Sequence, residues 1–301
     1  MNVGFYTNYK HFGLLGNSVT EALGVISEIG FGSIAPDEYG FSPSEKDNYL
    51  KEVREGACKY GLNLSYFHLP FVIEVHSDVF LGDEFFNKVL EYIDMAVELG
   101  VKYVVAHPFT PEKYQFYKHD EKFDYEPIRE FCEEVNLKFF RRLQPYLLKA
   151  GLRCAIENLF TTDEDYREQL PSACCTSSEW KKYIDTLGDP YCACLDTGHA
   201  NLALRDNGKL FQLVRDMGHR IEVLHINDNY AKWLKIGDWH QLPGVGDIDM
   251  IEFAKVLKEI GYNGDLNFEV IINARNRDFC IAQLKYIKAV GDIMIAEGGL
   301  S

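Results

Sequence analysis

Side chains that can bind metal ions or transfer protons recur along the 301-residue chain, each at the end of an apolar, β-rich run. In chain order they are His68, His107, Glu157, Asp196, His225 and Glu269. Imidazole nitrogens and carboxylate oxygens are the ligands that Zn, Mn, Fe and Co take in proteins. Several carboxylates held close together would repel one another without a cation. The pattern therefore predicts a divalent-metal site, provided that the fold brings these run ends together.

The segments between these residues have the pattern of a repeated strand and helix. A glycine recurs where an amphipathic helix is expected to end and an apolar run to begin, at Gly30, Gly61, Gly100, Gly151, Gly188, Gly218 and Gly261. Glycine suits a helix C-terminus because it takes the left-handed conformation without strain. Eight apolar runs predict strands at 3–6, 31–35, 62–67, 101–106, 152–156, 191–195, 221–224 and 265–270. Near-continuous apolar runs are typical of parallel strands buried on both faces.

Eight strands alternating with helices predict a single α/β domain over residues 1–301, a closed (β/α)8 TIM barrel. A doubly wound open sheet is the alternative, but residues 8–16 after the first strand contain no Gly-rich phosphate loop. In a barrel, the C-terminal ends of the strands form one ring, where barrel enzymes hold their catalytic residues. The side chains at the run ends should therefore converge at the barrel mouth, under long loops at 108–126, 158–176 and 227–248.

Composition narrows the partners and the location of the protein. The chain has 46 acidic and 31 basic residues, a net charge of −15, and its basic residues are scattered, which disfavours nucleic acid as a partner. No apolar run approaches the roughly 20 residues that a membrane helix needs. Residues 1–8 lack the pattern of a secretion signal, so a cytoplasmic location without a membrane partner is expected. The eight cysteines form no C-x-x-C pair and are predicted to be buried free thiols.

At these residues the chain resembles the xylose-isomerase-like barrel superfamily, which groups sugar isomerases and epimerases with apurinic-site endonucleases of the endonuclease IV type. The resemblance is carried by three stretches in order. They are Leu-Asp-Thr-Gly-His at 195–199, His-Ile-Asn-Asp at 225–228, and 238–249, which holds Asp-Trp-His and then Pro-Gly-Val-Gly-Asp. The resemblance implies a metal site made of Glu157, Asp196, His225 and Glu269. It also implies that His199 points at the substrate or at another metal ion.

The endonuclease branch of the superfamily carries additional metal ligands. These match His68, His107, His199, Asp238 and His240 of this chain. The resemblance thus implies one divalent metal ion, Mn or Zn above the others, with ligands for a second and a third. Two departures concern the substrate. Ketose epimerases of the family commonly place an Arg where this chain has His240, and relatives often end the second strand with a Glu that has no clear equivalent in residues 33–38.

The leading hypothesis is a metal-dependent isomerase or epimerase acting on a sugar, a sugar phosphate or a cyclitol, with dehydratases sharing the first step. The metal would polarise a substrate carbonyl. Glu157 and Glu269 would act as base and acid, and His199 would hold the oxygen that becomes negative. Further substrate contacts are expected from His68, His107, His240 and Trp239. Aromatic residues expected over the site, to exclude water, are Phe12, Phe109, Tyr114, Phe116, Trp233 and Trp239.

Two hypotheses from other classes stay open. One is a phosphodiesterase acting on abasic DNA through a metal cluster, which the complete ligand set favours and the net charge disfavours. The other is a barrel that binds a sugar or a metal ion without turnover, which the pair of carboxylates disfavours. The protein could also associate into a homo-oligomer through its helices under any of these hypotheses. The remaining histidines, expected in loops or at the surface, are His11, His76, His119 and His219. Of these, His11 follows the first strand and could face the barrel mouth.

Overall fold

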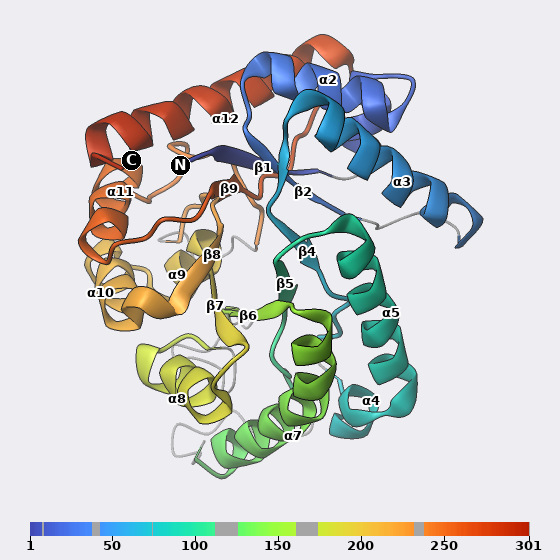
Figure 1. The fold of residues 1–301 in the computed structure, drawn as a ribbon. Helices are drawn as coiled ribbons and strands as arrows, with labels where there is room; N and C mark the ends of the chain where they lie inside the picture. Colours follow the sequence, from blue (N-terminus) through green and yellow to red (C-terminus); the bar gives the residue numbers. More distant parts are fainter. Residues whose placement is uncertain are drawn as a thin grey trace.

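The computed structural model describes residues 1–7, 9–37, 43–73, 75–111, 126–160, 174–231 and 238–300. Figure 1 shows parallel strands at the centre of a ring of helices. The strands are β1 (Val3–Thr7), β2 (Ser33–Pro36), β3 (Asn63–Leu64), β4 (Tyr66–His68), β5 (Tyr103–Ala106), β6 (Arg153–Glu157), β7 (Tyr191–Asp196), β8 (Ile221–His225) and β9 (Leu266–Phe268). Their order is β3-β2-β1-β9 in one sheet and β4-β5-β6-β7-β8 in the other.

The two sheets meet at both of their edges. The third predicted strand is interrupted at Ser65, so that β3 pairs with β2 and β4 pairs with β5. The Ser65 N–H donates to the Ile34 carbonyl at 2.9 Å and joins the sheets at this edge. At the other edge Ile226, directly after β8, forms a parallel bridge with Phe268 of β9. The strands therefore close into a ring, and the prediction of a (β/α)8 barrel is confirmed.

Helices cover the outside of the ring. They are α1 (Tyr9–Leu15), α2 (Val19–Ile29), α3 (Pro43–Tyr60), α4 (Ser77–Leu81), α5 (Asp83–Leu99), α7 (Glu126–Ala150), α8 (Ser177–Leu187), α9 (Thr197–Leu204), α10 (Asn207–Met217), α11 (Met250–Glu259) and α12 (Arg277–Gly298). The seven glycines expected at helix ends all have positive φ, between 55° and 105°. Side chains cap the starts of several helices, and at the start of α9 the Asp196 carboxylate accepts the His199 N–H at 2.6 Å.

Side chains alternate along each strand between two cores, as the period of a β-strand requires. In β7, Ala193 and Leu195 belong to the large core between strands and helices, whereas Cys192 and Cys194 belong to a small inner cluster. The inner cluster consists of Ala35, Tyr66, Val105, Ala155, Cys192, Cys194 and Val223, which come from six strands, two of them from β7. A residue placed two positions after one of these therefore faces the interior at the barrel mouth.

Three expectations about single residues are wrong. His11 is 5% exposed rather than at the surface, because α1 turns its ring onto Phe5, 5.4 Å away. Phe12 and Phe109, expected over the site, are buried in the outer core, where they pack against Tyr49 and Phe80. The expected positions Tyr114, Phe116, His119 and Trp233 lie outside the described residues.

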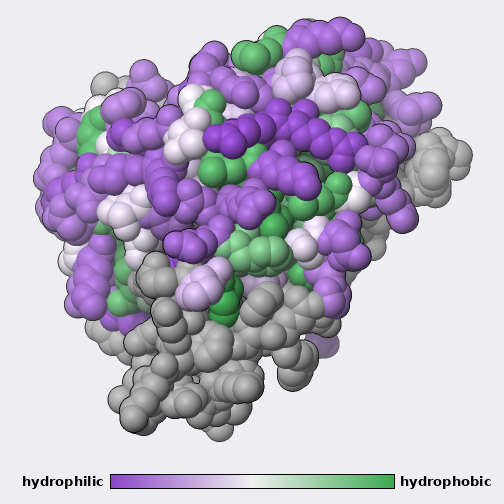
Figure 2. Space-filling model, turned by 90° about the horizontal axis from the view of Figure 1, so that it is seen from below, coloured by the Kyte–Doolittle hydropathy of each residue, from purple (hydrophilic) through white to green (hydrophobic). Residues whose placement is uncertain are grey.

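Most of the described outer surface seen from one side is hydrophilic (Figure 2). Seen from below Figure 1, the molecule presents a mainly hydrophilic face with hydrophobic residues in small patches (Figure 2). Within the described ranges, no helix combines the length and the apolar character that crossing a membrane requires. All eight cysteines lie in the described ranges and are free, and seven of them are buried.

Candidate metal centre

The alternation along the strands brings the predicted side chains to one place. Each of five strands carries an inner-cluster residue and, two positions later, a candidate ligand. The pairs are Tyr66 and His68, Val105 and His107, Ala155 and Glu157, Cys194 and Asp196, and Val223 and His225. Glu269 follows β9 directly, and its backbone N–H donates to the Ile226 carbonyl at 3.0 Å. All six predicted side chains therefore meet at the mouth of the barrel.

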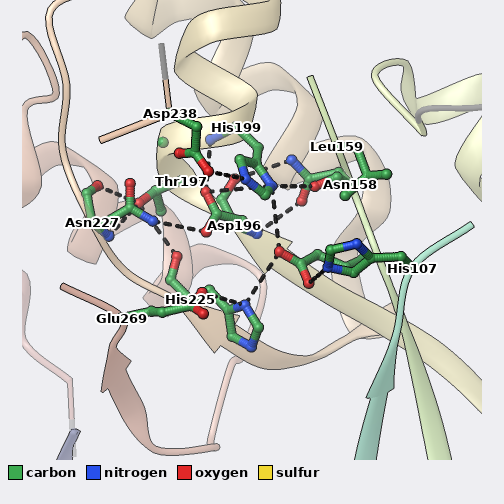
Figure 3. A network of polar contacts seen from close by, with 12 residues as sticks. His107, Asn158, Leu159, Asp196, Thr197, His199, His225, Asn227, Asp238 and Glu269 are labelled. Atoms are coloured by element: carbon green, nitrogen blue, oxygen red, sulfur yellow. Dashed lines mark hydrogen bonds and ion pairs between the residues drawn. The ribbon is translucent and has the colours of Figure 1, made fainter. Parts of the chain in front are cut away.

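Glu157 lies at the centre of this group and is 1% exposed. Its Oε2 atom is 3.4 Å from Nε2 of His68 and 3.1 Å from Nε2 of His107. Its Oε1 atom is 3.3 Å from the Nδ1 atoms of both His199 and His225. One buried carboxylate is thus shared by four imidazole rings. Three of these rings, those of His107, His199 and His225, are labelled in Figure 3.

A second carboxylate reaches the same histidine. The Oε2 atom of Glu269 is 2.7 Å from Nδ1 of His225. One ligand atom from each of Glu157, Asp196, His225 and Glu269 lies within 4.8 Å of the others. Such a spread is suitable for ligands of one divalent cation, whose bonds to nitrogen and oxygen are about 2.0–2.2 Å long.

Three further groups share residues with this central one, and one of them consists of Cys194 with Glu157 and His225. His68 and His107 form a group with Glu157, and His199 and His240 form another with Asp196. Asp238 belongs with the second of these: its Oδ2 atom is 2.8 Å from Nε2 of His240 and 3.1 Å from Nε2 of His199. The structure therefore brings all nine predicted metal-ligand candidates together.

Charges of opposite sign set the pKa values in the group. Burial disfavours the charged form of Glu157, but His225 and His107 outweigh burial and hold its pKa well below the usual range. His225 and His240 likewise outweigh burial at Glu269 and lower its pKa to about 2. Burial opposes protonation of His240, yet Glu269 and Asp238 raise its pKa to about 10. Protonated imidazoles therefore neutralise the carboxylates of the cation-free protein.

Asp196 behaves differently from the other carboxylates. Burial is the largest influence on it and raises its pKa to about 6, although His199 and His240 oppose this effect. The pKa of His107 is lowered, again because burial outweighs the attraction of Glu157. Carboxylates and neutral imidazoles are the forms that bind a metal ion. A cation that binds to them supplies the positive charge that is lost when their protons leave.

The chemistry of the group fits a divalent cation. Its donors are imidazole nitrogens and carboxylate oxygens, which suit Zn²⁺ and Mn²⁺. Within the described residues, the buried Oδ1 atom of Asp238 has no hydrogen-bond partner, although the other oxygen of this carboxylate contacts two histidines. An unpartnered buried carboxylate oxygen is costly unless a cation or a donor reaches it.

Seven of the nine candidate ligands line a cavity of about 690 Å³, namely His68, His107, Glu157, His199, Asp238, His240 and Glu269. The other two, Asp196 and His225, are fully buried. One wall is apolar and includes Phe71, which is 51% exposed and stacks on the His107 ring with centroids 4.4 Å apart. Trp239, a predicted substrate contact, is 55% exposed and does not line the described cavity. Its two neighbours Asp238 and His240 do line the cavity.

The cavity lining also includes two polar residues that the sequence did not reveal. They are Tyr6 of β1 and Asp37, which directly follows β2. Asp37 comes two positions after the inward-facing Ala35, so the period of two could have identified it. The Tyr6 hydroxyl is hydrogen-bonded to the Asp37 side chain, and burial together with Asp37 raises the pKa of Tyr6. Tyr6 is therefore a neutral hydroxyl in the cavity.

Comparison with known proteins adds a family and a fold. The family model described as the xylose isomerase-like TIM barrel matches residues 23–288. Among curated proteins, an uncharacterized protein of Methanocaldococcus jannaschii is 28% identical over 180 residues. This match covers 59% of the present chain and 53% of the relative, so it spans about half of that protein's length.

Solved structures similar to this one cover the chain from end to end. A D-tagatose 3-epimerase-like protein has a TM-score of 0.71 at 21% identity, covering 98% of this chain and 99% of its own. The IOLI protein with a bound zinc atom has a TM-score of 0.71 at 18% identity, covering 98% of each chain. These similarities establish a common barrel fold. Since the family match extends over most of the sequence, the chain belongs to the xylose isomerase-like TIM barrel family.

Proposed function

We propose that the protein is a divalent-metal-dependent isomerase or epimerase of a sugar or a related polyhydroxy carbonyl compound. One observation carries the proposal. The carboxylates of Glu157 and Glu269 face the same atom, Nδ1 of His225, at 3.3 Å and 2.7 Å. Two carboxylates at one cavity can take a proton from a carbon atom and return a proton to the opposite face or to the next carbon.

The metal ion, Mn²⁺ or Zn²⁺, is assigned to Glu157, Asp196, His225 and Glu269, whose ligand atoms lie within 4.8 Å of one another. When bound, such a cation acts as a Lewis acid on a carbonyl group. The zinc atom in the similar IOLI structure supports this assignment. Two additional ions would have ligands in the other groups, His68 and His107 with Glu157, and His199, Asp238 and His240 with Asp196.

The chain's own residues supply the remaining steps. Either Glu157 or Glu269 removes the proton next to the substrate carbonyl, and the other, in its protonated form, donates a proton to the opposite face of that carbon or to the next carbon. The carbonyl oxygen gains negative charge in this step. His199 stabilises it by donating a hydrogen bond, since Asp196 and Asp238 outweigh burial and raise the pKa of this imidazole. His68, His107 and His240 line the same cavity and contact the substrate, and Trp239 remains a predicted contact from the rim.

The cavity favours a small polyhydroxylated substrate. Its volume of about 690 Å³ lies in the usual range for small-molecule sites. Phe71 offers an apolar face on which the C–H side of a sugar can lie, whereas Tyr6 and Asp37 offer hydrogen-bonding groups to its hydroxyls. The name of the similar D-tagatose 3-epimerase-like protein supports a ketose.

One observation favours a second candidate, a phosphodiesterase acting on abasic DNA. The central ligand group shares Glu157 with the group of His68 and His107, and Asp196 with the group of His199 and His240. Clustered metal ions are suited to in-line displacement at phosphorus. The net charge of −15 opposes it, and Lys88 is the one lysine or arginine among the described residues that line the cavity. DNA binding requires several cationic contacts to the phosphates.

The two candidates are separated by incubating one metal-loaded preparation with two kinds of substrate. The first is a panel of ketoses, aldoses, their phosphates and cyclitol ketones, followed by NMR for interconversion. The second is a duplex with one abasic site, followed by gel electrophoresis. Interconversion of a panel member that stops on addition of a chelator supports the isomerase or epimerase. Strand cleavage without interconversion contradicts it and supports the phosphodiesterase.

A further inference from the structure

Three consecutive polar residues follow His225 and Ile226 and are fully buried. They are Asn227, Asp228 and Asn229, each 0% exposed, and we call them the bracing triplet. Buried polar side chains cost free energy unless they are hydrogen-bonded. Each member of the triplet forms hydrogen bonds with a segment that carries a candidate metal ligand.

The two asparagines hold the segment that begins α9. The Asn227 amide donates to Oδ2 of Asp196 at 2.7 Å. The Asn229 amide donates to the Gly198 carbonyl at 2.9 Å, and its oxygen accepts from the Asn201 amide at 2.9 Å. These contacts fix the Asp196 carboxylate and the turn of helix from which His199 projects.

Asp228 holds a different segment. Its Oδ2 atom accepts the backbone N–H groups of Gly244 and Gly246, both at 2.9 Å, and its Oδ1 atom accepts that of Ile248 at 3.2 Å. The main chain of Asp228 also exchanges two hydrogen bonds with Gln241, at 3.0 Å and 3.1 Å. The loop is therefore bound to Asp228 from the residue after His240 as far as Ile248.

The backbone of this loop needs such support. His240 has a φ of 42°, in the left-handed region that side chains other than glycine rarely adopt. A Cβ atom at Gly246 would overlap with the Asp228 carboxylate and with the Asn229 carbonyl. The loop is thus wrapped so closely around the carboxylate that no side chain fits between them.

We infer that Asp228 is a positioning residue that sets the ligand pair Asp238 and His240 for a divalent cation. The inference rests on the metal centre of the proposed function. It adds that different residues of the bracing triplet position different ligands. Asn227 and Asn229 support Asp196 and His199, whereas Asp228 supports the loop of Asp238 and His240. Loss of the Asp228 carboxylate weakens the cation held by that loop and leaves the cation held by His225 and Glu269 in place.

Metal content tests this inference. The wild type, Asp228→Asn and His240→Ala are loaded with Zn²⁺ and dialysed against a series of chelator concentrations, and the bound zinc is measured by mass spectrometry. Asparagine keeps the shape of Asp228 but turns an amide N–H₂ toward backbone N–H groups, so acceptors are lost. In Asp228→Asn, one equivalent should be bound about 10- to 100-fold more weakly. His240→Ala should lose the same equivalent of zinc. The double variant with Asp228→Asn and His240→Ala should lose no more zinc than His240→Ala alone.

Two additional variants separate positioning from folding. Gly246→Ala displaces the loop without removing a carboxylate, and it should weaken the same zinc equivalent. Asp206→Asn is the matched control, because Asp206 accepts a backbone N–H from Lys209 at the start of α10, away from the candidate ligands. It should keep the full metal content. Circular dichroism and thermal melting show which variants are folded.

Several results would overturn the inference. Wild-type zinc affinity in folded Asp228→Asn contradicts it, and so does loss of every equivalent together. Equal zinc content in the wild type and His240→Ala contradicts it as well, because the loop then holds no cation. If Asp228→Asn does not fold, Gly246→Ala decides by the same criteria. The readout does not involve turnover, so correct zinc contents without activity contradict the proposed function alone.

Discussion

The carboxylates of Glu157 and Glu269 meet at one atom, the Nδ1 of His225, which lies 3.3 Å from the first and 2.7 Å from the second. Carboxylates this close repel each other unless a positive charge lies between them. In the cation-free protein the imidazole of His225 supplies that charge, because these carboxylates help to outweigh its burial and raise its pKa. The same geometry can hold a divalent cation and present two proton-transfer groups to one cavity.

Replacing either carboxylate should stop proton transfer. Glu157→Gln and Glu269→Gln each remove a negative charge from the cation and a proton carrier from the cavity. We expect proton exchange on the substrate to fall by at least about 100-fold in each variant, the usual size of a general acid or base contribution. The measurement is the rate of exchange at saturating metal.

Glu222→Gln is the control for these two variants. Glu222 lies on β8 and accepts hydrogen bonds from Arg153 and Tyr103, remote from the cavity. This variant should melt at a lower temperature, because the ion pair with Arg153 is lost, and should keep the exchange rate of the wild type. Near-wild-type exchange in either Glu157→Gln or Glu269→Gln would show that the paired carboxylates do not transfer protons.

Metal content should distinguish a single ion from a cluster. His225 belongs to the central group, whereas His68 belongs to the group that it forms with His107 and Glu157. With one working ion, His225→Ala should lose the metal and His68→Ala should retain most of it. Equal losses in the two variants, measured by elemental analysis after dialysis, would point to a coupled cluster instead.

Cation binding should release protons. Imidazoles bind metal ions in their neutral form, and the raised pKa values of His199, His225 and His240 keep them protonated at pH 7 without a cation. The affinity for Zn²⁺ should therefore rise with pH above 7. Calorimetric titration in two buffers with different ionisation enthalpies measures the released protons. A binding heat that is the same in both buffers would be inconsistent with protonated ligands.

The cation-free protein should lose stability as the pH rises. The pKa of His240 is about 10 in the folded chain, against about 6.5 when unfolded. A raised pKa contributes stability that is complete below the unfolded value and is lost as the pH rises through the folded one. The melting temperature of chelator-treated protein should thus fall between pH 7 and 10. His240→Ala should flatten this slope, and an unchanged slope would argue against the raised pKa.

The barrel and the meeting of the strand ends followed from the sequence, because parallel strands place their C-termini on one ring. The run that ends in Asp196 is apolar throughout, and the run that ends in Glu157 is apolar except for Arg153. The glycines before both runs mark where the preceding helices end. Both signals are local. The prediction needed no knowledge of which loops pack together.

Residues whose role depends on packing could not be predicted from the sequence. Tyr6 has the pattern of a core residue in an apolar strand, and Asp37 lies beyond the predicted strand end, yet both line the cavity. Phe12 and Phe109 seemed available to cover a substrate, but neighbouring aromatic rings bury them in the outer core. The three-dimensional roles of the bracing triplet were likewise not predictable, since the partners of these residues outside the triplet lie 13 to 31 residues away.

The most direct test of the central claim is solvent deuterium incorporation. The protein loaded with Mn²⁺ or Zn²⁺ is incubated in heavy water with ketoses, aldoses, their phosphates and cyclitol ketones, and carbon-bound deuterium is read by mass spectrometry. The account predicts label next to the carbonyl of at least one compound, with loss of this label in Glu157→Gln and Glu269→Gln. Absence of label from every compound, with the metal demonstrably bound, would contradict the assignment of these two carboxylates as the base and acid of an isomerase or epimerase.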